Sequence, residues 1–277
     1  MLFVASLPPP LSPSPVPGEG FGERAKATSN KLPHRYDVPM PRKRVSLLGV
    51  PLDPVTQQEA VDLLLEFLRS NEQHHVMTPN SEMLVEARHN PEFKSVLNET
   101  SLNLPDSIGV KWFARLPARV TGVDTVTALC RALDEETPVF LLGAAEGVAQ
   151  RAGEVLKNLN VGLRICGTYA GSPKEEDAEA IIKRINDCQP HLLLVAYGAP
   201  QQDLWIHKYL KELPSVRVAM GIGGTFDFLA GTRKRAPRWM QRIGVEWLYR
   251  LIKEPKRIGR IWRAVAVFPL LALTCSK

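Results

Sequence analysis

The chain has 277 residues, of which 44% are hydrophobic and 23% charged, as expected for a globular domain with one sizeable core. Its four cysteines lie far apart and form no CxxC pair, so neither a zinc site nor a disulfide framework is indicated. A reducing cytoplasm is the expected compartment. No apolar run approaches the roughly 18 to 20 residues that a membrane span needs.

The net charge of +6 is concentrated near the C-terminus. Residues 232–263 hold eleven Lys and Arg against two Glu, a local charge of +9, which leaves −3 on the rest of the chain. A basic block on a nearly neutral body indicates a polyanionic partner: phosphate groups, an anionic membrane surface or nucleic acid.

The N-terminal segment differs in composition from the rest. Residues 1–41 hold nine of the 23 prolines and show no hydrophobic periodicity. Because such a segment cannot offset the entropy lost on ordering, we predict a disordered extension over 1–41 and expect residues 1–39 to be dispensable. The opening MLFVASL lacks a basic leading region, so no signal peptide is expected.

From residue 45 onward, predicted strands and helices alternate. The strands are short apolar runs, typical of strands covered on both faces: Val45–Val50, His75–Thr78, Ser101–Leu104, Val139–Leu142, Leu163–Thr168, His191–Tyr197 and Val216–Gly221. The predicted helices are Thr56–Arg69, Ser81–Arg88, Ser107–Arg115, Thr125–Glu135, Glu146–Leu159, Lys174–Cys188 and Gln201–Leu213.

This order predicts an α/β fold, a Rossmann-like parallel sheet flanked by helices, with a catalytic domain over residues 42–231. Residues 232–277 are predicted to form a basic, Trp-containing helical appendage at the C-terminus. Pro255 would split its basic block into two helices, because proline interrupts a helix.

Four polar or glycine-rich turns follow predicted strands: Thr78–Asn80, Pro105-Asp106, Gly198–Asp203 and Gly221–Gly224. In parallel α/β sheets, ligands bind beyond the carboxyl ends of the strands. One shared cleft is therefore expected there.

Each turn also has a purely structural interpretation. Asp106 could cap the helix that follows or act as a general base, and its position alone favours the cap. Thr78 and Asn80 could cap the next helix or hold a sugar hydroxyl. Gly223 and Gly224 could form a tight turn or let the backbone approach a diphosphate.

The basic block alternates arginines with Trp239, Trp247 and Trp262. Arginine binds phosphate through paired hydrogen bonds, and tryptophan suits a surface that is half apolar and half wet. The chain contains no Asp-x-Asp pair, the usual metal clamp on a sugar nucleotide, and we predict no metal site. A leaving diphosphate would then need arginines and backbone N–H groups to stabilise it.

Taken together, the motifs resemble the WecG/TagA/CpsF family of bacterial glycosyltransferases over about residues 45–263. The matching pieces are residues 78–82 (TPNSE), 104–106 (LPD), 122–124 (GVD), 198–203 (GAPQQD), 223–231 (GGTFDFLAG), 235–237 (RAP) and 246–255 (EWLYRLIKEP). Two positions depart from the family pattern: Ser107 stands where a glycine is usual, and Asp203 where a glutamate is usual.

The resemblance implies an inverting transfer without metal or cofactor. The donor would be a UDP-sugar carrying an N-acetylmannosamine-type sugar, and the acceptor a lipid-linked diphosphate, N-acetylglucosaminyl-diphospho-undecaprenol. Such enzymes serve cell-surface polysaccharide or teichoic acid synthesis. This implies a peripheral enzyme on the inner face of the cell membrane, in contact with its anionic surface and not with nucleic acid; a homo-oligomer stays open.

The resemblance also assigns roles to residues. Asp106 would be the catalytic base, with Thr78 beside it. The residues that we assign to substrate binding are Asn80, Asp124, Gln202, Gly223, Gly224, Arg250, Arg257 and Arg260. Of these, the three arginines would complete the site and grip the diphosphate.

Two other classes of function are compatible with single features of the chain. A Rossmann-type nucleotide-sugar oxidoreductase would need a complete GxGxxG turn and an acidic ribose partner about 20 residues further on, and we find neither. A nucleic-acid-binding protein could use the basic C-terminus.

Overall fold

The computed structural model describes residues 43–237, 239–240, 243–255 and 258–275. The predicted extension over 1–41 and Arg257 lie outside these residues, and the side chain of Arg250 is not described either. None of the described helices is both long and apolar enough to cross a membrane.

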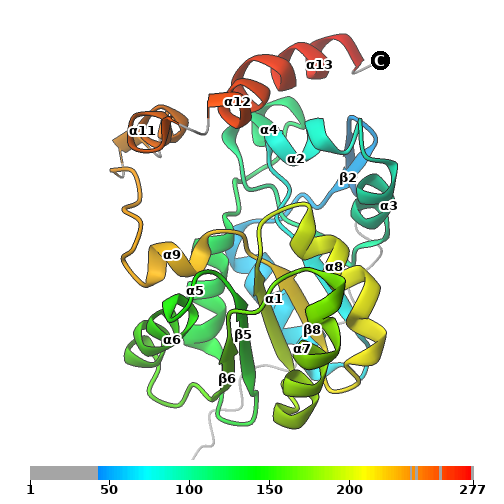
Figure 1. Cartoon of the computed structure of the whole chain (residues 1–277). Helices are drawn as coiled ribbons and strands as arrows, with labels where there is room; N and C mark the ends of the chain where they lie inside the picture. The colour runs from blue at the N-terminus through cyan, green and yellow to red at the C-terminus, as the bar shows by residue number, and fades with distance from the viewer. Residues whose placement is uncertain (1–42, 238, 241–242, 256–257, 276–277) are drawn as a thin grey trace, which may run out of the picture. The chain divides into compact units, whose positions relative to one another are not determined.

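In the described part of the chain, six strands form one parallel sheet (Figure 1). Its order is β4-β3-β8-β7-β5-β6, and the strands are β3 (His74–Met77), β4 (Leu102–Asn103), β5 (Val139–Gly143), β6 (Ile165–Tyr169), β7 (Leu192–Ala196) and β8 (Val218–Gly221). The predicted Rossmann-like parallel sheet is confirmed.

Helices cover both faces of the sheet, as alternate residues of β5 show. Val139 and Leu141 pack into one core cluster, while Phe140 and Leu142 pack into another. The first cluster includes side chains of α1 (Gln57–Arg69), α5 (Gly122–Ala132), α6 (Val148–Leu159) and α9 (Thr225–Leu229). The second includes side chains of α7 (Glu175–Cys188) and α8 (Gln201–Tyr209), which runs into η1 (Leu210–Glu212). Burial on both faces explains why the strands are continuous apolar runs.

The first helix begins where its sequence predicts. Thr56 caps α1: its hydroxyl accepts from the Glu59 N–H at 3.3 Å, and the Glu59 carboxylate accepts from the Thr56 N–H at 2.7 Å. This reciprocal capping box satisfies two backbone donors that a helix end would otherwise leave without partners.

The prediction of one continuous strand over Val45–Val50 is wrong. The segment forms an antiparallel hairpin of β1 (Val45–Leu47) and β2 (Val50–Leu52), separate from the main sheet. The chain reverses at Leu48 and Gly49, whose φ angles are 54° and 77°. Glycine adopts this left-handed conformation readily, and Gly49 was the available signal for a turn.

The hairpin belongs to a third core cluster, built with α2 (Ser81–Glu86), α3 (Pro91–Glu99), α4 (Ile108–Phe113) and α13 (Phe268–Cys275). Helix α3 was not predicted, although its start carries a recognisable signal: Asn90 caps it and Pro91 occupies the first turn. Phe268 of α13 is fully buried and meets the Phe113 ring edge-on, with ring centroids 5.5 Å apart.

Toward its C-terminus the chain forms α11 (Glu246–Lys253) and, beyond Pro255, α12 (Ile258–Trp262), η3 (Arg263–Val267) and α13 (Figure 1). Helix α13 lies against α2 and α4, and η3 lies against α2. The C-terminal segment predicted as an appendage therefore also contributes Phe268 and Ala272 to a packed core.

Candidate active site

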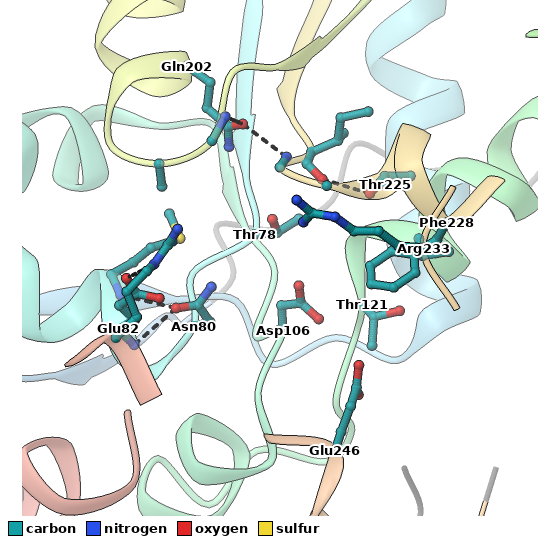
Figure 2. A pocket seen from close by; sticks show the side chains of 18 of the residues that line it. Thr78, Asn80, Glu82, Asp106, Thr121, Gln202, Thr225, Phe228, Arg233 and Glu246 are labelled. Carbon is teal, nitrogen blue, oxygen red and sulfur yellow. Dashed lines mark hydrogen bonds and ion pairs between the residues drawn. The ribbon is translucent and has the colours of Figure 1, made fainter. Parts of the chain in front are cut away.

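A cleft of about 1240 Å³ lies at the carboxyl ends of four adjacent strands, β4, β3, β8 and β7 (Figure 2). Residues from all four predicted turns line it: Thr78, Asn80, Asp106, Gly198, Ala199, Pro200, Gln201, Gln202, Ile222, Gly223 and Gly224. Because parallel strands all end at the same edge of the sheet, turns far apart in the sequence come together here.

Asp106 lines the cleft just beyond β4 and is held through its backbone. Its N–H donates to the carbonyl of Pro79 at 2.9 Å, and its carbonyl accepts from Arg119 Nε at 3.0 Å. The capping interpretation is wrong for this residue, because Ser107 caps α4: its hydroxyl accepts from the Val110 N–H at 3.2 Å. The helix therefore does not need the Asp106 side chain for its cap.

Thr78 follows β3, the strand next to β4. Its hydroxyl donates to the Gly221 carbonyl at 3.4 Å, and the side chain is largely buried. Figure 2 shows both Thr78 and Asp106 in the middle of the view of the cleft. The two residues predicted to carry the chemistry thus line the same cleft, just beyond the ends of two neighbouring strands.

Asn80 caps a helix, the first of the two roles considered for it, and its position leaves the second role open. Its side-chain oxygen accepts from the backbone N–H groups of Glu82 and Met83 at 3.0 and 3.1 Å, so it caps α2. It also lines the cleft. Because the oxygen is used for the cap, its amide NH₂ is the group that it can offer to a ligand.

Gln202 ties the two glycine-containing turns together. Its side-chain oxygen accepts from the Gly198 N–H at 3.0 Å and from the Gly223 N–H at 2.9 Å (Figure 2). Gly223 has a φ of 53°, and a Cβ built on it would meet nothing within 4 Å, so it faces open space. The backbone can approach a ligand closely here, but the Gly223 N–H itself is already engaged by Gln202.

Asp124 binds Arg235 rather than lying on the wall of the cleft. Its two carboxylate oxygens accept from Arg235 Nη1 and Nη2 at 2.6 and 3.0 Å, and the Thr121 hydroxyl donates to it at 2.6 Å. The hydrogen bond from Arg235 lowers the pKa of Asp124 below its ordinary value. Arg235 does line the cleft, so Asp124 holds a cation in place there.

Seven cationic side chains among the described residues line the cleft: Arg119, Arg233, Lys234, Arg235, Lys253, Arg260 and Arg263. Several are paired with carboxylates of other elements. Arg119 Nη2 lies 2.9 Å from Glu246 of α11, and Arg260, a predicted substrate ligand, pairs with Glu82 of α2. An anionic ligand would compete with these carboxylates for the arginines.

Sequence reasoning missed Arg119, which stands outside the basic block and has no motif of its own. The roles predicted for Arg250 and Arg257 remain predictions, since neither side chain is among those that the structure describes. Asp203 follows Gln202 in its motif, but its side chain is fully buried behind the turn. It therefore cannot touch a substrate.

Fold and site together define an α/β protein with a large cleft, lined by several cationic side chains, at the carboxyl ends of its parallel strands. The model of the glycosyl transferase WecG/TagA/CpsF family matches residues 45–277, and the chain belongs to this family. The resemblance drawn from its motifs is confirmed, and the match favours neither the oxidoreductase nor the nucleic-acid-binding alternative.

Two relatives carry the name N-acetylglucosaminyldiphosphoundecaprenol N-acetyl-beta-D-mannosaminyltransferase. The protein of Bacillus spizizenii is 34% identical over 231 residues, which cover 78% of this chain and 87% of the relative. The protein of Bacillus subtilis is 32% identical over 208 residues, covering 73% of this chain and 78% of the relative.

Proposed function

We propose that this chain transfers an N-acetylmannosamine-type sugar from a UDP-sugar to N-acetylglucosaminyl-diphospho-undecaprenol. The observation that carries the proposal is that Asp106 and Thr78 line one cleft just beyond the ends of adjacent strands. The names of both relatives support the choice of sugar and acceptor.

The proposed reaction is a single displacement with inversion. The acceptor hydroxyl attacks the anomeric carbon on the face opposite the UDP, and its proton passes to the Asp106 carboxylate. The bond between the anomeric carbon and the diphosphate oxygen breaks as the new glycosidic bond forms, and its electron pair leaves with UDP. A carboxylate within hydrogen-bond reach of the hydroxyl is what such a step requires. Thr78, which lines the same cleft, would orient the reacting groups.

Cationic side chains would stabilise the departing diphosphate. Arg119, Arg233 and Arg235 all line the cleft, and they come from two separate segments of the chain. Asp124 keeps the Arg235 guanidinium in position. Because the sequence holds no Asp-x-Asp pair, we propose that these arginines, with Arg250, Arg257 and Arg260, take the place of a metal ion.

We further propose that the C-terminal helices rest on the anionic inner surface of the cell membrane. Trp262, Leu270 and Leu273 are 64%, 63% and 73% exposed, which is unusual for large apolar side chains. Apolar side chains beside a basic block are typical of a peptide that lies in a membrane interface. The lipid tail of the acceptor would stay in the bilayer while its sugar enters the cleft.

The test is a transfer assay with purified protein and lipid-linked acceptor. UDP-N-acetylmannosamine, its uronic acid and UDP-N-acetylglucosamine are offered separately, with and without a metal chelator. We expect transfer from one of the first two, unaffected by the chelator and producing a glycosidic bond of inverted configuration. Transfer from UDP-N-acetylglucosamine alone, a retained configuration or loss with the chelator would contradict the corresponding part of the proposal.

A further inference from the structure

The orientation of the Gln202 amide fixes how two walls of the cleft meet. One oxygen accepts two backbone N–H groups, from the turn after β7 and the turn after β8. An amide in the reverse orientation would point its NH₂ at these two donors and lose both hydrogen bonds, at a cost of roughly 0.5–1.5 kcal/mol for each. The NH₂ group therefore points away from these two turns, and it needs a hydrogen-bond acceptor of its own.

The acceptor is Asp203. The Gln202 Nε2 donates to Asp203 Oδ2 at 3.3 Å, and neither residue is more than 2% exposed. The other oxygen, Oδ1, lies 3.8 Å from Nε2 of His75 on β3. Among the described residues, neither of these two atoms has a hydrogen-bond partner.

A fully buried carboxyl group lowers the stability of the fold, so we expect Asp203 to serve a role at this position. Burial raises the pKa of Asp203 above its ordinary value. The hydrogen bond to Gln202 survives in either protonation state, because Oδ2 can accept whether or not Oδ1 carries a proton. The contact to Gln202 is thus independent of the charge on Asp203.

The backbone of β8 leaves room for this pair only because residue 221 is glycine. A Cβ on Gly221 would overlap Asp203 Oδ1 and lie 2.6 Å from Gln202 Nε2, closer than real side chains approach. The requirement is steric: no side chain fits between the strand end and the two polar groups.

We propose that Asp203 is a positioning residue that fixes the Gln202 amide, and through it the separation of the Gly198 and Gly223 turns across the cleft. It does not touch substrate. Its effect on catalysis rests on the function proposed above, whereas its effect on the turns does not.

The structural arm of the test needs no substrate: hydrogen exchange at the Gly198 and Gly223 amides. Asp203→Leu keeps the branched shape of the side chain, although it is larger, and removes the acceptor, so both amides should exchange roughly tenfold faster, the loss of about one hydrogen bond. Asp203→Asn retains an oxygen for Gln202 and should leave both rates close to wild type. Trp205→Phe, a buried change on the same helix, is the matched control.

Gly221→Ala provides a second route should Asp203→Leu fail to fold, since it displaces the same pair and should accelerate the same two amides. Unchanged exchange in both Asp203→Leu and Gly221→Ala, or equal acceleration by Asp203→Leu and Asp203→Asn, would overturn the proposal.

The catalytic arm compares kcat and KM of the same variants. We expect Asp203→Leu to lower kcat/KM roughly tenfold without lowering the melting temperature, since it removes a group that burial disfavours. Asp203→Asn should retain activity. A parallel fall of activity and melting temperature would reduce Asp203 to a structural residue. Absence of transfer by the wild type would contradict the proposed function, and the exchange result would still decide the positioning role.

Discussion

The turns at the sheet ends and the C-terminal helices meet at the same cleft but are held there by different forces. The turns are fixed by hydrogen bonds that involve the backbone, such as the part-buried ones from Gly198 and Gly223 to the buried Gln202 side chain. The C-terminal helices face the cleft through half-exposed ion pairs such as Arg263 with Glu86, whose side chains are 43% and 31% exposed. Exposed pairs contribute little and are screened by salt, so the turns are the rigid part of the site.

If the turns carry the chemistry, the largest loss of turnover should come from Asp106→Asn. This variant keeps the shape of the side chain but cannot take up a proton, so kcat should fall by roughly 10²–10⁴-fold. The melting temperature should barely change, because Ser107 caps α4. Asp187→Asn, an exposed change on α7, is the matched control. Near-wild-type turnover in Asp106→Asn would place the base elsewhere in the cleft.

Within the C-terminal segment, only the buried side chains should contribute strongly to the stability of the fold. Phe268→Ala empties a fully buried site and should lower the free energy of unfolding by about 3–5 kcal/mol in a denaturant titration. Leu270→Ala on the same helix is the control: that side chain is exposed, so its effect should stay within about 0.5 kcal/mol. Equal effects would show that α13 does not pack as described.

Membrane binding should depend on the exposed side chains of that segment and not on its packing. The triple variant Trp262→Ser, Leu270→Ser, Leu273→Ser should bind anionic vesicles at least roughly tenfold more weakly, at an unchanged melting temperature. Val161→Ser, an exposed apolar change far along the chain, should leave binding unaltered. Wild-type binding should weaken at high salt, and salt-insensitive binding would contradict an electrostatic contribution.

The smallest effect is expected from a single ion pair between the C-terminal segment and α2. A double-mutant cycle of Arg263→Gln and Glu86→Gln should give a coupling energy of about 0.2–1 kcal/mol that shrinks as salt is added. A coupling several times larger, or one unaffected by salt, would mean that the C-terminal helices are held as firmly as the turns.

Sequence patterns predicted the features that depend on residues close together in the chain. Short apolar runs predicted the strands of the sheet. The polar turns after these runs predicted the cleft, because the strands are parallel and their carboxyl ends lie at one edge of the sheet. The hairpin at Gly49 was missed, since one apolar run contained two strands. The hydrogen bonds from the Gly223 N–H to Gln202 and from Arg235 to Asp124 span 21 and 111 residues, and no local sequence pattern predicts such contacts.

The separate roles of the turns at the sheet ends and of the C-terminal helices can be measured directly as turnover on two acceptors. These acceptors differ only in the lipid, which is either undecaprenyl or a short water-soluble chain. We expect the triple variant at Trp262, Leu270 and Leu273 to lose turnover on the vesicle-embedded acceptor and to keep it on the soluble one. Asp106→Asn should lose turnover on both. Near-wild-type turnover of Asp106→Asn on the soluble acceptor would contradict the assignment of the chemistry to the turns at the sheet ends.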